Sequence, residues 1–246
     1  MRQLALLFGL SAVFVSGSVS AAEISAAVAA NFTKPAEVLG AAFTARTGDT
    51  VTFSFGATGA LYTQITQGAP FQVFLSADNK RPAQAVTDGF GVDGSVFTYA
   101  VGKVVLYSPT LDLTDGEAVL KAGEFQHIAI ADPRTAPYGA AGLEVVDKLG
   151  LTDAITPKQV TGENITQTLQ FIDSANAELG FVALSQVIDK PAPQVWAAPA
   201  TLYSPILQDA VLLKTGEGEP AARAFLEFLQ SDEGKAIIHK YGYDTH

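Results

Sequence analysis

Strand-like and helix-like segments alternate along most of this chain, and that alternation constrains the fold more than any other feature of the sequence. Three β-rich runs near the N-terminal end are each followed by a run with helical spacing. These pairs cover 23–29 with 33–46, 51–55 with 60–67, and 73–76 with 79–88. Successive β–α–β units form a mostly parallel sheet with helices on its faces, so the pattern predicts an α/β protein.

A second α/β unit follows, and the segments after it are too few to form a third. Its strand patterns cover 97–107, 125–131, 179–184 and 194–197, and its helical patterns cover 139–149 and 164–175. The chain then ends with a strand pattern at 210–213 and helical patterns at 220–229 and 233–241.

We therefore expect the second unit to be inserted into the first. Lobe 1 would comprise residues 23–101 and 206–246, and lobe 2 residues 102–205, each a mostly parallel sheet flanked by helices. Two crossing strands, near Tyr99–Lys103 and near Tyr203–Gln208, would join the lobes as a hinge. Ligands of such proteins bind between the lobes, beyond the carboxyl ends of the parallel strands.

The first 22 residues have the pattern of a signal peptide. Arg2 gives the basic start, Leu4–Val15 is an apolar run too short to span a bilayer, and small residues lead up to Ala22. We expect cleavage near Ala21 or Ala22 and export to the periplasm as a soluble protein. The sequence contains no cysteine, so we expect neither a disulfide nor a lipid attached to a cysteine thiol.

The charge of the chain bears on its partners. It has 25 acidic and 15 basic residues, a net charge of −10, which argues against nucleic acid because that partner needs a basic surface. A small anion is not excluded, since N–H and hydroxyl donors act at short range and distant carboxylates are screened within about 10 Å at moderate salt. We expect a monomer.

Four junctions between a strand and a helix share one design, a cluster of small residues and hydroxyls. A helix N-terminus presents unpaired N–H groups and the positive end of the peptide dipoles, and it binds anions without a full positive charge. Two of the junctions fall in each predicted lobe, so together they predict a site for a small oxyanion. They are Ala26–Thr33, Ser54–Ala60, Asp132–Ala140 and Thr161–Thr166.

The order and spacing of these motifs resemble those of the periplasmic molybdate-binding proteins of ATP-driven (ABC) importers, over nearly the whole mature chain. The motifs that carry the resemblance are Val28-Ala29-Ala30-Asn31-Phe32-Thr33, Ser54-Phe55-Gly56-Ala57-Thr58-Gly59, Gln67-Gly68-Ala69-Pro70, Leu75-Ser76-Ala77-Asp78, Ala131-Asp132-Pro133, Pro137-Tyr138-Gly139, Leu179-Gly180-Phe181-Val182-Ala183 and Lys240-Tyr241-Gly242-Tyr243.

The resemblance implies a two-lobed type II periplasmic binding fold that holds molybdate or tungstate by neutral hydrogen bonds and delivers it to a membrane permease. It implies no cofactor and no enzymatic activity. Carried over by motif, the ligand-binding positions are Asn31 with the adjacent Ala30, Thr58, the N–H of Tyr138 and the N–H of Ile165. Many members of the family have a tyrosine hydroxyl donor where this chain has Ala183. The phenol of Tyr138 is a candidate to fold over the anion in its place.

Each of these positions also has an ordinary structural explanation. Asn31 is a favoured helix cap, Thr58 lies between glycines typical of tight turns, and Ile165 would bury its side chain in any case. Tyr138 follows a proline and is compatible with an exposed turn.

The charged residues near these junctions favour a fully deprotonated dianion. We interpret Arg134 as a surface partner of Asp132, and Asp132 as a cap of the turn that follows it. The remaining donors are neutral, and phosphate, which keeps protons near neutral pH, would need an acceptor in its site.

Other kinds of site find less support. Motifs of hydrolases, zinc proteases and nucleotide-binding loops are absent from the sequence. His127, His239 and His246 are far apart and are expected at the surface or at helix ends. Four phenols could ligate ferric iron but have no accompanying carboxylate cluster; they are Tyr99, Tyr107, Tyr138 and Tyr203. Two alternatives stay open: the same mechanism with chromate or sulfate, and an enzyme on a two-lobed scaffold.

Overall fold

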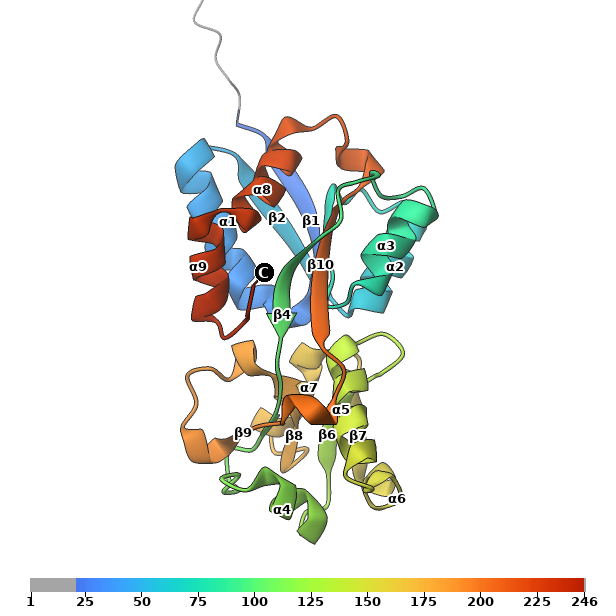
Figure 1. The fold of residues 1–246 in the computed structure, drawn as a ribbon, viewed down its shortest axis with the longest axis vertical. Coiled ribbons are helices and arrows are strands. Elements are labelled where there is room, and N and C mark those ends of the chain that lie inside the picture. Colours follow the sequence, from blue (N-terminus) through green and yellow to red (C-terminus); the bar gives the residue numbers. More distant parts are fainter. Residues whose placement is uncertain (1–20, 246) are drawn as a thin grey trace, which may run out of the picture.

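The computed structural model describes residues 21–245, which form two lobes joined end to end (Figure 1). The predicted signal peptide, apart from Ala21 and Ala22, lies outside the described residues. Over the described part of the chain, no helix has the length and apolar character needed to cross a membrane.

Lobe 1 is built on a five-stranded sheet in the order β2-β1-β3-β10-β4. These strands are β1 (Glu23–Ala29), β2 (Thr50–Gly56), β3 (Val73–Leu75), β4 (Phe97–Gly102) and β10 (Ile206–Leu212). Helices cover both faces, with one group packed on each side in Figure 1. One group is α1 (Thr33–Thr47), α8 (Pro220–Gln230) and α9 (Asp232–Lys240), and the other is α2 (Thr58–Thr66) and α3 (Lys80–Thr87).

Lobe 2 repeats this architecture with the strand order β7-β6-β8-β5-β9. Its strands are β5 (Val104–Tyr107), β6 (Ile128–Ala131), β7 (Gln159–Gly162), β8 (Leu179–Ala183) and β9 (Val195–Ala197). Its helices are α4 (Gly116–Ala122), α5 (Pro137–Lys148), α6 (Thr152–Ile155) and α7 (Ile165–Asp173). The central strands β6 and β8 are buried along their whole length, as expected of strands covered on both faces.

Each sheet contains a single reversed strand, and it is the strand that enters from the other lobe. In lobe 1, β10 is antiparallel to both β3 and β4. In lobe 2, β5 is antiparallel to both β8 and β9. The other strands of each sheet run in one direction, so the sheets are mostly parallel as predicted. The carboxyl ends of β1, β2, β3, β6 and β8 therefore face the boundary between the lobes.

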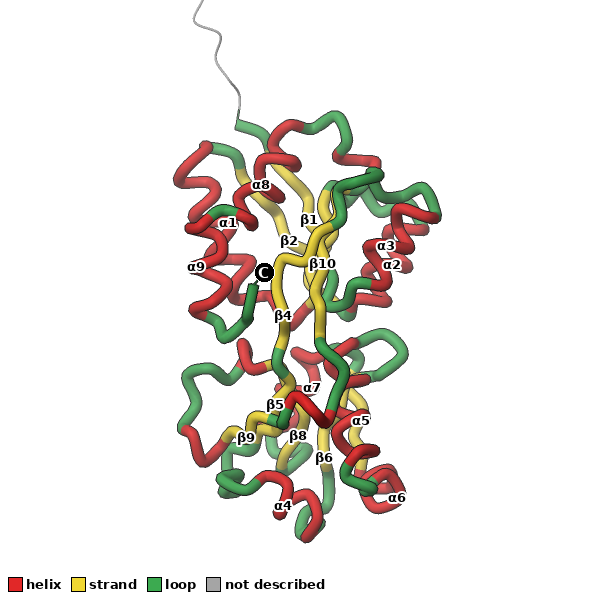
Figure 2. The backbone as a smooth tube through the Cα atoms, viewed as in Figure 1, coloured by secondary structure: helices red, strands yellow, loops and turns green. Residues whose placement is uncertain are grey.

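The chain crosses between the sheets at Lys103, between β4 and β5, and again just before β10 (Figure 2). The C-terminal segment adds a third connection at this hinge, because the backbone of Asp244 pairs with that of Val101 and its carboxylate contacts Lys103 Nζ at 2.9 Å. The predicted division into domains at 101/102 and 205/206 stays a prediction, although the two sheets separate close to these positions.

Candidate functional site

A small, tight cavity lies at the boundary between the lobes, with about 10 Å³ of space open to the centre of a water molecule. All five residues that the sequence predicts as ligand contacts line it, and they come from both lobes. The complete lining is Ala29, Ala30, Asn31, Gly56, Ala57, Thr58, Ala77, Ala136, Pro137, Tyr138 and Ile165.

Four helices begin at this cavity, and three of them lack a side-chain cap. The residues before the short 3₁₀ helix η1 (Ala30–Phe32) and before α2 and α5 are Ala29, Ala57 and Ala136, and none makes a side-chain cap hydrogen bond. Alanine is a poor N-cap, costing about 0.5–2 kcal/mol relative to serine, threonine, asparagine or aspartate. The first turns of these helices are therefore candidate anion-binding positions.

Away from the cavity, two helices have a side-chain cap and four, α1, α3, α6 and α8, have none among the described residues. Asp115 caps α4 and Ser231 caps α9, each accepting a hydrogen bond from the first turn. At the cavity, α7 is the exception, because Asn164 accepts from the N–H groups of Thr166 and Gln167. The N–H of Ile165, the first residue of α7, is not engaged by that cap.

Thr58 presents a hydroxyl from lobe 1. Its Oγ1 accepts a hydrogen bond of 3.0 Å from the N–H of Ala77, which leaves its own proton available to an acceptor in the cavity. The next N–H along α2, that of Gly59, donates at 2.9 Å to the carbonyl of Thr135 in lobe 2. The same turn therefore lines the cavity and joins the lobes.

Asn31 is buried and belongs to a polar network on the hinge side of the cavity. Its Nδ2 donates to Gln208 Oε1 at 2.7 Å and to the hydroxyl of Tyr243 at 2.9 Å. Ser185 of lobe 2 donates to the carbonyl of Asn31 at 2.8 Å. Both hydrogens of the Asn31 amide are thus already given to protein groups.

The phenol of Tyr138 does not fold over the cavity, and that expectation is wrong. Its hydroxyl accepts from Gln208 Nε2 at 3.4 Å, and a Cβ placed on Gly102 would lie 2.1 Å from it, so the ring points toward the hinge. What Tyr138 retains for a ligand is its N–H, in the first turn of α5. Ala183 is fully buried, its N–H donates to Gln186 Oε1 at 3.0 Å, and it is not part of the cavity lining.

The cavity lining is uncharged. Arg134, with 85% of its side chain exposed, pairs with Asp132 at 2.7 Å, and hydrogen bonds from Arg134 hold the pKa of Asp132 below its usual range. Asp132 Oδ1 also accepts from the backbone N–H of Arg134, as a residue that caps a turn would. Such an arrangement suits a small anion held by N–H and hydroxyl donors.

Metal sites gain no support within residues 21–245. No group of three or more histidine, aspartate or glutamate side chains there could hold a metal ion. Burial raises the pKa of Tyr99 and Tyr138 well above 10, which disfavours the phenolates that ferric iron would need. His239 lies at the end of α9, where its Nδ1 is 3.0 Å from the carbonyl of Tyr243.

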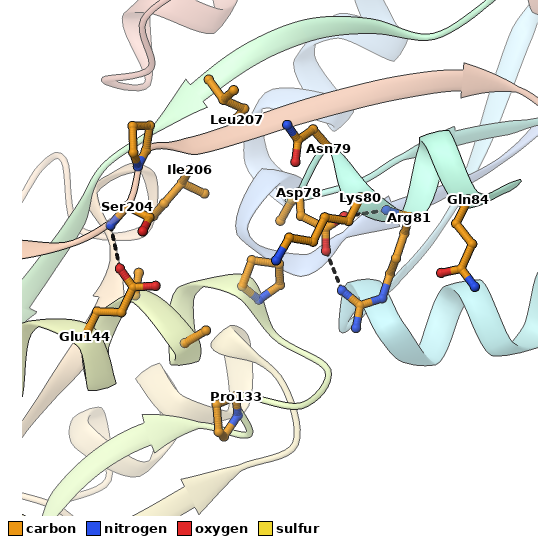
Figure 3. Close-up of a pocket in the computed structure, with 15 residues that line it drawn as sticks. Asp78, Asn79, Lys80, Arg81, Gln84, Pro133, Glu144, Ser204, Ile206 and Leu207 are labelled. Atoms are coloured by element: carbon orange, nitrogen blue, oxygen red, sulfur yellow. Dashed lines mark hydrogen bonds and ion pairs between the residues drawn. The ribbon is translucent and has the colours of Figure 1, made fainter. Parts of the chain in front are cut away.

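A larger crevice adjoins the cavity and shares Ala77 and Pro137 with it. Figure 3 shows Lys80 and Arg81 on one side of this crevice and Glu144 and Ser204 on the other. Arg81 is paired with Asp78, and Glu144 accepts a hydrogen bond from the N–H of Ser204.

The sequence predicted the four junctions. It did not predict the alanines at three N-cap positions or the polar network of Asn31, Gln208 and Tyr243. A serine, threonine, aspartate or asparagine is common before a helix. The alanine that stands before the helix at three of the four junctions could therefore have been noticed in the sequence. Gln208 gave no comparable signal, and Tyr243 stood only in the closing Lys240–Tyr243 motif without a predicted role, because the two residues lie 177 and 212 positions from Asn31 in the sequence.

The chain is similar in sequence to known solute-binding proteins. Residues 24–244 match the family model described as bacterial extracellular solute-binding protein. The chain is 53% identical to the molybdate-binding protein ModA of Rhodobacter capsulatus, over 98% of this chain and 94% of that one. It is 47% identical to ModA of Azotobacter vinelandii, over 97% and 96% of the two chains.

A solved structure agrees with this. The periplasmic molybdate-binding protein of Azotobacter vinelandii superposes with a TM-score of 0.87 at 38% identity, covering 91% of this chain and 99% of that one. The two-lobed arrangement of the sheets is therefore shared with that protein.

Proposed function

This chain belongs to the family of bacterial extracellular solute-binding proteins, and we propose that it captures molybdate, and also tungstate, between its lobes for an ABC importer. The family is one of solute-binding proteins and not of enzymes. The observation that carries the proposal is the uncharged cavity onto which three uncapped helix N-termini and the capped start of α7 converge.

The ligand contacts follow from the lining. We assign the anion to Asn31 with Ala30, to Thr58 through its hydroxyl and N–H, and to the N–H groups of Tyr138 and Ile165. These donors are neutral, so they match an anion that is fully deprotonated near neutral pH. A protonated phosphate would need an acceptor, and the lining offers no carboxylate.

Binding and closure are linked in this scheme. The donors come from both lobes, so an anion gains its full set of hydrogen bonds only when the lobes are together. Its differential affinity then favours the closed form, which the membrane permease recognises. We further propose that the mature chain acts in the periplasm as a monomer after cleavage near Ala21 or Ala22, with no nucleic acid partner.

A thermal-shift series on the purified mature protein tests the ligand. Molybdate, tungstate, chromate, sulfate and phosphate are added at equal concentrations. We expect molybdate and tungstate to raise the Tm most, since a ligand at 100 times its Kd stabilises the folded state by about 2.7 kcal/mol. Equal stabilisation by sulfate would overturn the assignment to molybdate and favour a general tetrahedral-oxyanion binder.

A further inference from the structure

Four polar side chains meet behind the cavity, on its hinge side, and the anion contacts do not account for them. They are Gln208, Tyr99, Tyr138 and Tyr243, all of them buried, with Gln208 at 0% exposure. A buried amide is costly unless its donors and acceptors are paired. A glutamine at the start of the central strand β10 therefore needs a reason to be there.

Gln208 contacts two of the residues assigned to the anion, one from each lobe. Its Oε1 accepts from Asn31 Nδ2 at 2.7 Å and from the hydroxyl of Tyr99 at 3.4 Å. Its Nε2 lies 3.4 Å from the hydroxyl of Tyr138 and donates to it. Gln208 itself does not line the cavity.

The direction of these bonds conflicts with anion binding. Asn31 lines the cavity, yet both hydrogens of its Nδ2 go to Gln208 and Tyr243. The atom of this amide that is left to meet a ligand is Oδ1, an acceptor, which repels an anion.

A paired half-turn of the two amides removes the conflict and keeps the network bonded. Asn31 Nδ2 then donates to the anion, and its Oδ1 accepts from Gln208 Nε2 and from the Tyr243 hydroxyl. The single hydrogen of Tyr243 moves to Oδ1 from the Asn31 carbonyl and Ser185 Oγ, each 2.9 Å away, and the Asn31 carbonyl keeps its 2.8 Å bond from Ser185. Gln208 Oε1, now on the other side, accepts from the Tyr138 hydroxyl. The hydroxyl of Tyr99 keeps its 3.0 Å bond to the carbonyl of Ser76 and accepts from Gln208. Because phenol hydroxyls both donate and accept, they accommodate either direction.

We propose that Gln208 is a positioning residue of the anion site, whose amide turns together with that of Asn31 and so decides which Asn31 atom faces the anion. The inference rests on the proposed function insofar as it needs an oxyanion in the cavity. In this proposal, strand β10 at the hinge influences anion binding through Gln208, although Gln208 does not contact the anion.

A double-mutant cycle on the mature protein tests this, using Gln208→Leu, Asn31→Ala and the double variant. The probe is whichever of molybdate, tungstate, chromate and sulfate raises the wild-type Tm most, and calorimetry gives its Kd. We expect Gln208→Leu to weaken binding about tenfold in the wild-type background but less than about twofold when Asn31 is alanine, the mark of coupled residues. Equal losses in the two backgrounds would overturn the proposal.

Ser108→Ala is the matched control. It removes a buried hydroxyl that donates to the carbonyl of Glu178 at 2.6 Å, and Ser108 is not part of the cavity lining. We expect its Kd to stay within about twofold of wild type even where the ligand-free Tm falls. A loss equal to that of Gln208→Leu would mean that affinity falls with any loss of fold stability, against the proposal.

A measurement on the wild type covers the case in which Gln208→Leu does not fold. The side-chain amide signals of Asn31 and Gln208 are followed by ¹⁵N NMR during anion titration. Both pairs of signals should shift together, and a shift of Asn31 alone would refute the paired turn. Preferential binding of sulfate would overturn the assignment to molybdate but not this inference. Additive effects of the two substitutions would overturn this inference but not the assignment to molybdate. If none of the four anions binds, both fail.

Discussion

At the scale of single residues, the site works by leaving donors unused. Thr58 shows this most simply, because its oxygen accepts from Ala77 while its proton remains available. The hydroxyl is held in place by a backbone group, so its orientation is fixed before a ligand arrives, and little ordering is needed on binding.

Replacing Thr58 with alanine should weaken molybdate binding by about 1–3 kcal/mol, because a donor to a charged group is lost. The measurement is isothermal titration calorimetry with the mature protein. Thr58→Ser is the matched control, since it keeps the hydroxyl and should stay close to the wild-type affinity. If Thr58→Ala binds as tightly as wild type, Thr58 does not contact the anion.

At the scale of helices and strands, the chain gives up stability where it needs a site. Ala57 and Ala136 stand at N-cap positions with extended backbone, where a serine would fit and would cap the helix. A capping side chain and a bound anion accept hydrogen bonds from the same N–H groups, so a capped helix start binds an anion less well.

Ala136→Ser should therefore move stability and affinity in opposite directions. We expect the ligand-free protein to gain about 0.5–2 kcal/mol from the new cap, while molybdate binds more weakly because the serine oxygen competes for the N–H groups of α5. Denaturant unfolding and calorimetry give the two quantities. Ser231→Ala, which removes the existing cap of α9 far from the cavity, should lose stability and keep its affinity. A gain of affinity in Ala136→Ser would contradict this account.

The hinge strand β4 carries a second constraint, at Gly102. Its φ is not in the left-handed region, so its backbone accepts alanine, but a Cβ there would lie 2.1 Å from the Tyr138 hydroxyl of lobe 2 and 2.9 Å from Gln208 Nε2. We expect Gly102→Ala to hold the lobes apart and to lower molybdate affinity about tenfold, in keeping with the cost of overpacking.

Tyr138→Phe added to Gly102→Ala should restore part of that affinity, because it removes the overlapping oxygen and the next atom of the ring lies at 2.9 Å. Gly218→Ala is the control, since a Cβ there meets nothing within 4 Å. Both are read by calorimetry. Unchanged binding in Gly102→Ala would show that closure does not bring Tyr138 against β4.

The sequence predicts best those helices and strands whose pattern of apolar and turn residues is complete within the segment itself. The range of β1 is reproduced because it is a mostly apolar run that is buried over most of its length, and nearly all of α1 is reproduced because Gly48, in the left-handed conformation, ends it. The prediction for β10 began at residue 210 instead of 206, since Gln208 and Asp209 are polar yet buried. The pattern also gave no sign of β7, whose four residues are mostly polar, or of the short helices α4 and α6.

The same distinction holds at the site. The four junctions were predictable because each is a few consecutive residues. The roles of Gln208 and Tyr243 were not, because they arise only when the hinge brings the two ends of the chain beside Asn31. Long-range contacts of this kind leave no local signal in a single sequence.

At the scale of the whole molecule, the two lobes meet in the described residues through loops that also form the cavity. Direct bonds across the boundary include Gly59 N–H to the carbonyl of Thr135 at 2.9 Å and Arg81 Nη2 to the carbonyl of Arg134 at 3.0 Å. Single neutral hydrogen bonds contribute about 0.5–1.5 kcal/mol each. An anion bonded to both lobes can therefore decide the balance between open and closed forms.

Molybdate affinity should be independent of pH between about 6 and 9, because the cavity is lined by no group that titrates in that range. The phenols of the network are ionisable groups beside the cavity, and burial raises the pKa of Tyr99, Tyr138 and Tyr243. A pKa raised by folding means that the neutral phenol is favoured in the folded state. Its contribution to stability is complete below the unfolded pKa of about 10 and is lost as the pH rises through the folded value.

Calorimetry at several pH values, in buffers of different ionisation enthalpy, checks the binding part. The observed enthalpy should not depend on the buffer, because no proton is taken up or released when the anion binds. The ligand-free Tm should show no loss from the phenol network up to about pH 10 and should fall above it, as the phenols ionise. Release of a proton on binding near pH 7 would instead place a titratable donor at the anion, and the neutral cavity would then be the wrong site.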